Sequence, residues 1–182
     1  VDEYQKEIEE SRKQIKELQE DIQNQQRSID NMMSQINDKD TIPKSLVRLE
    51  SDEKELKNKI KTIQKNIKFY QENDTCPSCK QDIQQHHKDN VFEEKAKEQE
   101  SIGNQLNSLS ESIEYTEKRM GDINAILNSI HNIEKQISKK QNEISVSNQY
   151  IDKMQKSIES VLVEGTEVQE TKDELNQLIG EG

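Results

Sequence analysis

Two cysteines, Cys76 and Cys79, are the residues of this sequence whose type and spacing suggest chemistry. They are the only cysteines in the chain, and they lie in the segment ENDTCPSCKQDI, residues 72–83, with Pro77 between them. A Cys-x-x-Cys pair can bind a soft metal ion through its thiolates, or it can cycle between dithiol and disulfide. It can also be a turn that happens to contain two thiols.

A shared zinc site is the interpretation that spacing and position favour. Structural zinc takes four ligands, and one turn of this chain offers two thiolates. His86 and His87 are the nearest further candidates, but adjacent residues on a helix point about 100° apart, so both could hardly bind one ion. His131 lies far along the chain and is interpreted as a solvated residue. Two thiolates from this chain and two from a second copy would complete a tetrathiolate site around one zinc ion.

Four other interpretations of the cysteine pair stay open. A thioredoxin-type redox site needs the first cysteine at a helix N-terminus beside a sheet, and no strand is predicted here. A structural disulfide is rare inside cells. A plain coiled-coil scaffold with incidental cysteines is possible, as is a redox-sensitive linker in which Cys76 and Cys79 oxidise and release zinc.

The rest of the sequence predicts the helices that position this pair. The 182 residues are 35% charged, 29% hydrophobic and 3% aromatic. This is too few apolar residues for an ordinary globular core. The apolar residues nevertheless recur at alternating steps of three and four, the a/d pattern of a coiled coil. Four such seams cover residues 1–36, 46–70, 102–130 and 130–175.

The cysteines fall between the second and third seams, so the sequence predicts an all-α chain that turns back on itself. We expect a long antiparallel intrachain coiled-coil hairpin, with an ascending arm at 1–72, an apex at 73–84 and a descending arm at 85–182. The competing arrangement is one continuous helix that dimerises in parallel. Pro77 argues against it, because proline lacks the N–H of the helical hydrogen bond and disfavours helix at the preceding residue.

The seams contain two irregularities and a weak end. Across residues 37–45 the phase shifts, and Pro43 predicts a break or kink; at 127–130 it slips again, as in a stammer. Each can be a tolerated irregularity or a functional hinge. Pairing measured from the apex places residue 1 opposite about residue 155, so we expect a weak tail after about residue 160. Because the chain starts and stops in mid-seam, we expect it to be a piece of a longer protein.

Several residues are predicted to shape the apex. Pro77 helps to fix a turn in which the backbone N–H groups of Ser78 to Lys80 can point at the Cys76 sulfur and stabilise its charge. The descending helix has two possible capping residues, Asp82 and Asn90, each with Gln or Glu three positions later. We favour Asp82, because it gives the shorter turn.

The charge of the chain bears on its partners. A net charge of −11 repels phosphate on average, so no direct nucleic-acid binding is expected from the acidic arms. No apolar run has the length needed to cross a bilayer, and we expect a cytoplasmic protein without membrane contact. The sequence contains no Walker motif and no acid-base constellation, so we expect no catalytic residues and no enzyme activity in this segment.

The apex resembles a known family. A Cys-Pro-x-Cys turn, the following KQDI that places Ile83 four residues after Cys79, and long heptad arms resemble the zinc hook of SMC-like ATPases of double-strand-break repair. These include the SbcC-type exonuclease subunit and its archaeal, eukaryotic and phage relatives. The motif match covers residues 76–83. Such proteins often carry Gly directly after the second Cys, and Ser or Thr after the aliphatic residue, where this chain has Lys80 and Gln84.

The resemblance implies a mechanical function. Two hooks would share one zinc ion through four cysteines, so the segment would be a zinc-dependent homodimerisation and spacer element. The missing ends of the chain would form an ATP-binding head that contacts a nuclease subunit and DNA. The protein would then work in DNA repair and recombination, in the cytoplasm or with DNA in the nucleoid or nucleus.

Overall fold

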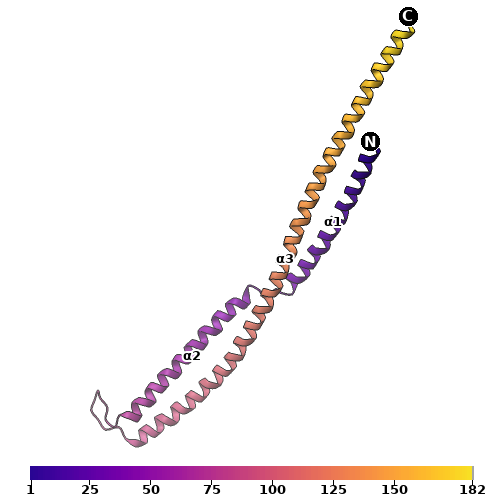
Figure 1. The fold of residues 1–182 in the computed structure, drawn as a ribbon. Coiled ribbons are helices and arrows are strands. Elements are labelled where there is room, and N and C mark those ends of the chain that lie inside the picture. The colour runs from indigo at the N-terminus through magenta and orange to yellow at the C-terminus, as the bar shows by residue number, and fades with distance from the viewer. Residues whose placement is uncertain (182) are drawn as a thin grey trace. The chain divides into compact units, whose positions relative to one another are not determined.

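The computed structural model describes residues 1–181, which form three helices (Figure 1). These are α1 (Asp2–Ser34), α2 (Thr41–Glu72) and α3 (Gln85–Gly180), of 33, 32 and 96 residues. Within the described residues the only β-pairing is one isolated bridge, so the predicted all-α class is confirmed. No helix in this part of the chain is both long and apolar enough to cross a membrane.

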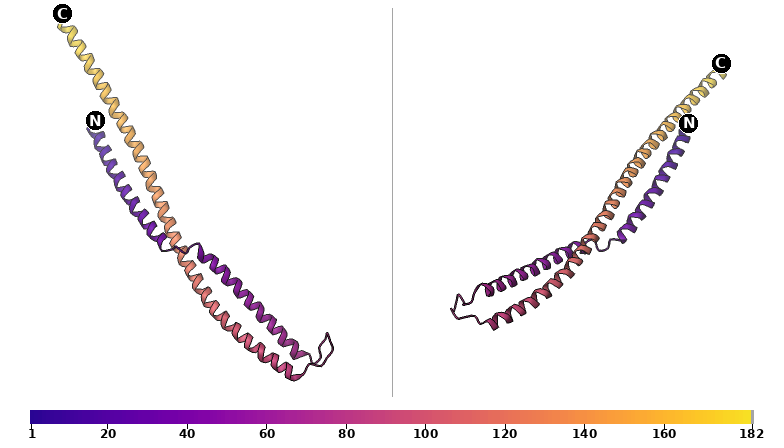
Figure 2. Two further views of the ribbon diagram at one scale, coloured as in Figure 1. Left: turned by 180° about the vertical axis from the view of Figure 1, so that it is seen from behind. Right: turned by 60° about the horizontal axis from the view of Figure 1, so that its bottom comes forward.

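The helices belong to two compact units. One consists of Val1–Gln35 and the chain from Leu127 onward, and the other of Ile36–Ile126. In the first unit α1 lies beside the C-terminal part of α3, and in the second α2 lies beside the N-terminal part of α3 (Figures 1 and 2).

The paired helices run antiparallel within each unit. In the first unit, Glu7 accepts a hydrogen bond from Tyr150, whereas Gln25, later in α1, meets Gln136, earlier in α3. In the second unit the contacts of Asp38 with Arg119 and of Asp74 with Lys88 follow the same order. Both units therefore have the pairing direction that a hairpin requires. A single coiled coil with a zinc-hook apex stays a prediction.

The covered face of α1 follows the predicted seam, including its polar positions. Gln25 donates a hydrogen bond to Gln136 at 2.8 Å and accepts one from Lys140 Nζ at 3.2 Å, so this seam amide has partners. The apolar core of the unit joins Ile8 and Ile15 of α1 to α3. The first predicted seam positions, Val1 and Tyr4, are exposed. The buried or half-buried seam positions of α1 are Ile8, Ser11, Ile15, Leu18, Ile22, Gln25, Ile29 and Met32.

The covered face of α3 shows where the phase slips. From Phe92 to Leu127 the covered positions alternate by three and four, and from Leu127 two steps of three lead through Ile130 to Ile133. The covered face of α3 thus changes phase between Leu127 and Ile133. Thr116, which sequence reasoning left out of the seam, is only 6% exposed and donates a hydrogen bond to the Ser112 carbonyl at 2.7 Å.

The break between α1 and α2 lies slightly earlier than predicted. The prediction places it at 37–45, whereas α1 ends at Ser34 and α2 starts at Thr41. Pro43 lies inside the first turn of α2. A proline is tolerated there because the first N–H groups of a helix have no intrahelical partner.

The residues of this break are held firmly. Ile36 is 1% exposed, the most buried large side chain among the described residues. Arg119 donates to both carboxylate oxygens of Asp38, from Nε at 2.9 Å and from Nη2 at 2.8 Å. These hydrogen bonds lower the pKa of Asp38 and raise that of Arg119. The break is thus a packed and paired joint within its unit.

The last part of α3 has no covering partner in the chain. Every described residue from 159 onward is exposed, although the helix continues to Gly180. The weak tail after about residue 160 stays a prediction. The exposed apolar residues of the tail are Val161, Leu162, Val163, Val168, Leu175, Leu178 and Ile179.

Replacing Ile36 by Ala tests the joint. We expect Ile36→Ala to lower the free energy of unfolding by about 2–4 kcal/mol, because it leaves a cavity at a fully buried position. Val47→Ala, at a position 67% exposed, is the matched control and should change it by less than about 0.5 kcal/mol. Urea unfolding followed by circular dichroism measures both. Equal effects would show that Ile36 contributes no more than a surface residue.

Candidate metal site at the apex

The chain between α2 and α3 is a short two-stranded turn. Thr75 and Asp82 form an antiparallel bridge, and the Ile83 N–H donates to the Asp74 carbonyl at 2.7 Å. The preference for Asp82 as the helix cap is therefore wrong, since this residue is part of the turn. The first helical hydrogen bond of α3 runs from the Lys88 N–H to the Gln84 carbonyl. Backbone pairing across the turn sets the start of α3. A capping motif in the sequence does not show that pairing.

The tip of the turn holds the two cysteines. The Cys76 N–H donates to the Gln81 carbonyl and the Lys80 N–H donates to the Cys76 carbonyl, each at 2.8 Å. Lys80 has a φ of 58°, the only positive φ of a non-glycine residue among those described. This is the position at which zinc-hook proteins often have Gly, which adopts a positive φ without steric cost. The turn needs that backbone conformation, and here a lysine adopts it.

The two thiols lie close together and in different environments. Cys76 and Cys79 approach to within 3.4 Å; Cys76 is half-buried and Cys79 is exposed. The Cys76 sulfur accepts hydrogen bonds first from the backbone N–H of Cys79 and then from that of Ser78, with smaller contributions from the Cys79 thiol and the Lys80 N–H. Burial opposes them only in part, so the pKa of Cys76 is lowered. Pro77 begins the segment that presents these groups.

A hollow of about 480 Å³ opens beside the thiols. Ile83 is half-buried in its wall, where its aliphatic side chain supports the turn. The Tyr70 ring meets Phe69 edge to face, with ring centroids 5.2 Å apart, and its other neighbour is His87 at 5.7 Å. The lining residues are Phe69, Tyr70, Cys76, Cys79, Gln81, Asp82, Ile83, Gln84 and His87.

The histidines differ in their surroundings. His87 packs on Tyr70 and lines the hollow, whereas His86 Nε2 lies 3.5 Å from the Asn90 amide nitrogen. His131 lies 4.0 Å from Glu134 on α3, far from the apex in sequence. Within residues 1–181 no cluster of three or more His, Cys, Asp or Glu side chains is arranged to hold a metal ion. The structure thus brings the two thiols together and does not join a histidine to them.

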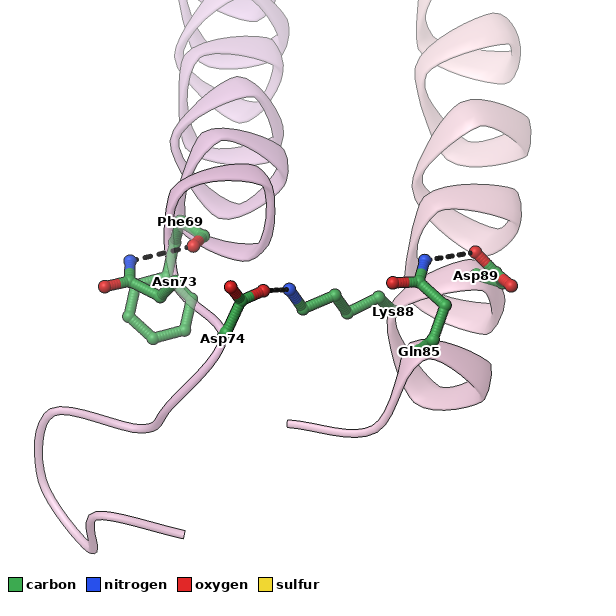
Figure 3. Close-up of polar contacts among 6 residues, drawn as sticks. All are labelled: Phe69, Asn73, Asp74, Gln85, Lys88 and Asp89. Atoms are coloured by element: carbon green, nitrogen blue, oxygen red, sulfur yellow. Dashed lines mark hydrogen bonds and ion pairs between the residues drawn. The ribbon is translucent and has the colours of Figure 1, made fainter. Parts of the chain in front are cut away.

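The base of the turn is closed by an ion pair that sequence reasoning missed (Figure 3). Lys88 Nζ lies 2.6 Å from Asp74 Oδ1, and its hydrogen bond lowers the pKa of this carboxyl. The lysine is only 5% exposed. Lysine is usually a surface residue, so the residue type at position 88 did not predict burial. Its position in the sequence does predict burial, because Lys88 lies four residues before Phe92 and so continues the seam of α3.

The two helix ends at the apex carry their own polar contacts. The Asn73 side-chain amide donates to the Phe69 carbonyl at 2.8 Å and so satisfies a carbonyl of the last turn of α2 (Figure 3). Gln85 donates to Asp89 at 2.9 Å on the first turn of α3. The apex is therefore anchored on both sides.

No protein-family model, no curated protein and no solved structure matches this chain. The function of the apex has to be inferred from its residues and their geometry.

The environment of Cys76 predicts its reactivity. Because the thiolate is the nucleophile, a lowered pKa should move the pH profile of alkylation by iodoacetamide to lower pH. The test uses Cys79→Ser, which keeps the backbone N–H at residue 79, in the presence of chelator. We expect the midpoint for Cys76 to lie lower in the folded chain than in the same chain in urea. Identical midpoints would show that the N–H groups do not stabilise the thiolate.

The backbone of Lys80 provides a second prediction. A positive φ costs a residue with a Cβ roughly 1 kcal/mol relative to Gly, and more for a β-branched residue. Lys80→Gly should therefore keep the low alkylation midpoint of Cys76, and Lys80→Val should raise it toward the value of the unfolded chain. The same pH profiles measure both. An unchanged alkylation midpoint of Cys76 in Lys80→Val would contradict the claim that the turn requires a positive φ at residue 80.

Proposed function

We propose that the apex is half of a zinc site shared by two chains, and that the segment is a zinc-dependent dimerisation and spacer element. The observation that carries this proposal is the pair of cysteines at an exposed turn, 3.4 Å apart. The resemblance to the zinc hook of SMC-like repair ATPases points the same way. Both arguments concern Cys76 and Cys79.

The donor set fits zinc. Zinc binds thiolates at about 2.3 Å, so a tetrahedral site holds its sulfurs about 3.8 Å apart. The two cysteines of the turn approach to within 3.4 Å, near enough for one ion to bind both thiolates. The N–H groups directed at Cys76 favour the thiolate that zinc requires. When bound, zinc would supply the bonds that join two turns.

A second copy is the source of ligands that this geometry favours. A closed structural zinc site has four ligands, and one turn supplies two. Cys79 is exposed, so a partner can reach it. Within residues 1–181 no histidine joins the two thiols in a cluster of three or more possible metal ligands, and His86 lies beside Asn90. Two turns would therefore share one zinc ion through four cysteines.

The arms would act as a spacer. Each unit pairs its helices antiparallel along an apolar seam, which supports the interpretation of the chain as a coiled-coil hairpin. Such a hairpin would set a distance, and the apex would join two molecules at its end. By resemblance, a head outside this segment would bind ATP, a nuclease subunit and DNA. We propose no enzyme activity for the segment itself and a location in the cytoplasm or with DNA.

Sedimentation with and without chelator tests the proposal. We expect the wild-type chain to be a dimer with half an equivalent of zinc per chain, and chelator to make it a monomer. Cys79→Ser should be monomeric with unchanged helix content, because the seams need no metal. Low pH should also dissociate the dimer, since protons compete with zinc for the thiolates. Analytical ultracentrifugation with zinc analysis measures these outcomes.

The double variant His86→Ala/His87→Ala is the matched control at the same apex. It should dimerise and bind zinc as the wild type does. A wild-type dimer indifferent to chelator would refute the hook and favour a plain scaffold. One zinc per monomer, lost in the histidine variant, would establish a site within one chain. A disulfide between Cys76 and Cys79 that forms readily and expels zinc would favour the redox-sensitive linker.

A further inference from the structure

One face of α2 carries a stripe of lysines in an otherwise acidic chain. Residues 54–68 contain six lysines and one glutamate, a net charge of +5, whereas the whole chain has −11. At 100° per residue, five of these lysines fall within an arc of about 80° and along about 21 Å of helix. The lysine stripe consists of Lys54, Lys57, Lys61, Lys65 and Lys68.

The lysine stripe points away from the helix pair. All five residues are exposed, whereas the seam residues Ile60, Ile63 and Ile67 on the other side of α2 are buried or half-buried. The sixth lysine, Lys59, is not part of the stripe: it lines a groove between α2 and α3 with Glu98. The stripe is therefore an outer surface of its unit.

Little negative charge neutralises the stripe. Lys57 pairs with Glu53 at 3.0 Å and Lys68 with Glu72 at 3.9 Å, both as exposed contacts along α2. Within residues 1–181 no ion pair joins Lys54, Lys61 or Lys65 to an acidic side chain, and none joins any stripe lysine to α3. Three charges in a row are thus available to a ligand.

The acidic character of the whole chain does not cancel this local charge. At physiological ionic strength exposed charges are screened beyond about 8 Å, which is shorter than the stripe itself. A ligand at the stripe therefore senses the lysines and their near neighbours. The net charge of the whole chain predicts repulsion of phosphate, but the lysine stripe is a locally basic surface.

We propose that the lysine stripe binds the phosphodiester backbone of duplex nucleic acid. Along 21 Å of axis each strand of a duplex carries about six phosphates, a number that five lysines can match. The stripe contains no aromatic side chain on which bases could stack, and its lysine ammonium groups are flexible point charges suited to phosphate. Binding should therefore be independent of sequence and strongly dependent on salt. It needs neither zinc nor a second chain.

The test measures fluorescence anisotropy of a labelled 30-base-pair random duplex DNA with the full 182-residue chain in EDTA. We expect log K to fall with log salt with a slope between about −2.7 and −4.5, for three to five neutralised phosphates. The variant Lys54→Gln/Lys61→Gln/Lys65→Gln should bind at least tenfold more weakly, with a slope shallower by about 2.7. The corresponding triple arginine variant should bind as the wild type does.

The matched control changes the same number of charges elsewhere. Lys6→Gln/Lys13→Gln/Lys16→Gln removes three exposed lysines of α1, so a local stripe predicts an affinity within twofold of the wild type. Equal loss in both triple variants would overturn the proposal, as would absence of DNA binding by the wild type at 50 mM salt. If polyglutamate displaces the labelled DNA as effectively as unlabelled duplex does, the stripe would be assigned to an acidic protein. Binding to anionic vesicles without binding to DNA would assign it to a membrane. Circular dichroism checks that all variants remain helical.

Discussion

A shortage of apolar side chains is the constraint on which this fold depends. With 29% hydrophobic residues, the chain can keep its isoleucines and leucines out of water only by aligning them along one face of each helix and pairing the faces. Burial alternates by three and four along α1, α2 and α3 up to residue 158, apart from the two steps of three between Leu127 and Ile133. The polar seam residue Gln25 has partners in Gln136 and Lys140. Most residues off this seam are exposed, among them the five residues of the lysine stripe.

Where the seam is interrupted, polar contacts hold the chain. Before α2, Arg119 donates two hydrogen bonds to Asp38 and so holds the segment between α1 and α2, in which Ile36 is buried. At its end the buried Lys88 reaches across to Asp74 below the apex. These contacts keep the arms in register at the two places where periodicity gives no support.

The unit that carries the apex combines two different surfaces. The apex presents two thiols in a turn whose backbone N–H groups favour the thiolate, a chemistry suited to zinc and to joining chains. The lysine stripe lies on α2 of the same unit, on the side away from the seam. If both proposals hold, one short region would join molecules through a metal and contact nucleic acid through charge. The two activities can be separated, because one needs Cys79 and the other needs Lys61.

The sequence by itself determined the all-α class and the spacing of the apolar residues along each helix, because a helix repeats regularly and its residue spacing predicts which face is buried. It did not determine the boundary of α3, where Asp82 resembles a helix cap but pairs with Thr75. Nor did it show the burial of Lys88 or the backbone of Lys80. These depend on hydrogen bonds and ion pairs between segments that no period relates, so only the tertiary structure decides them.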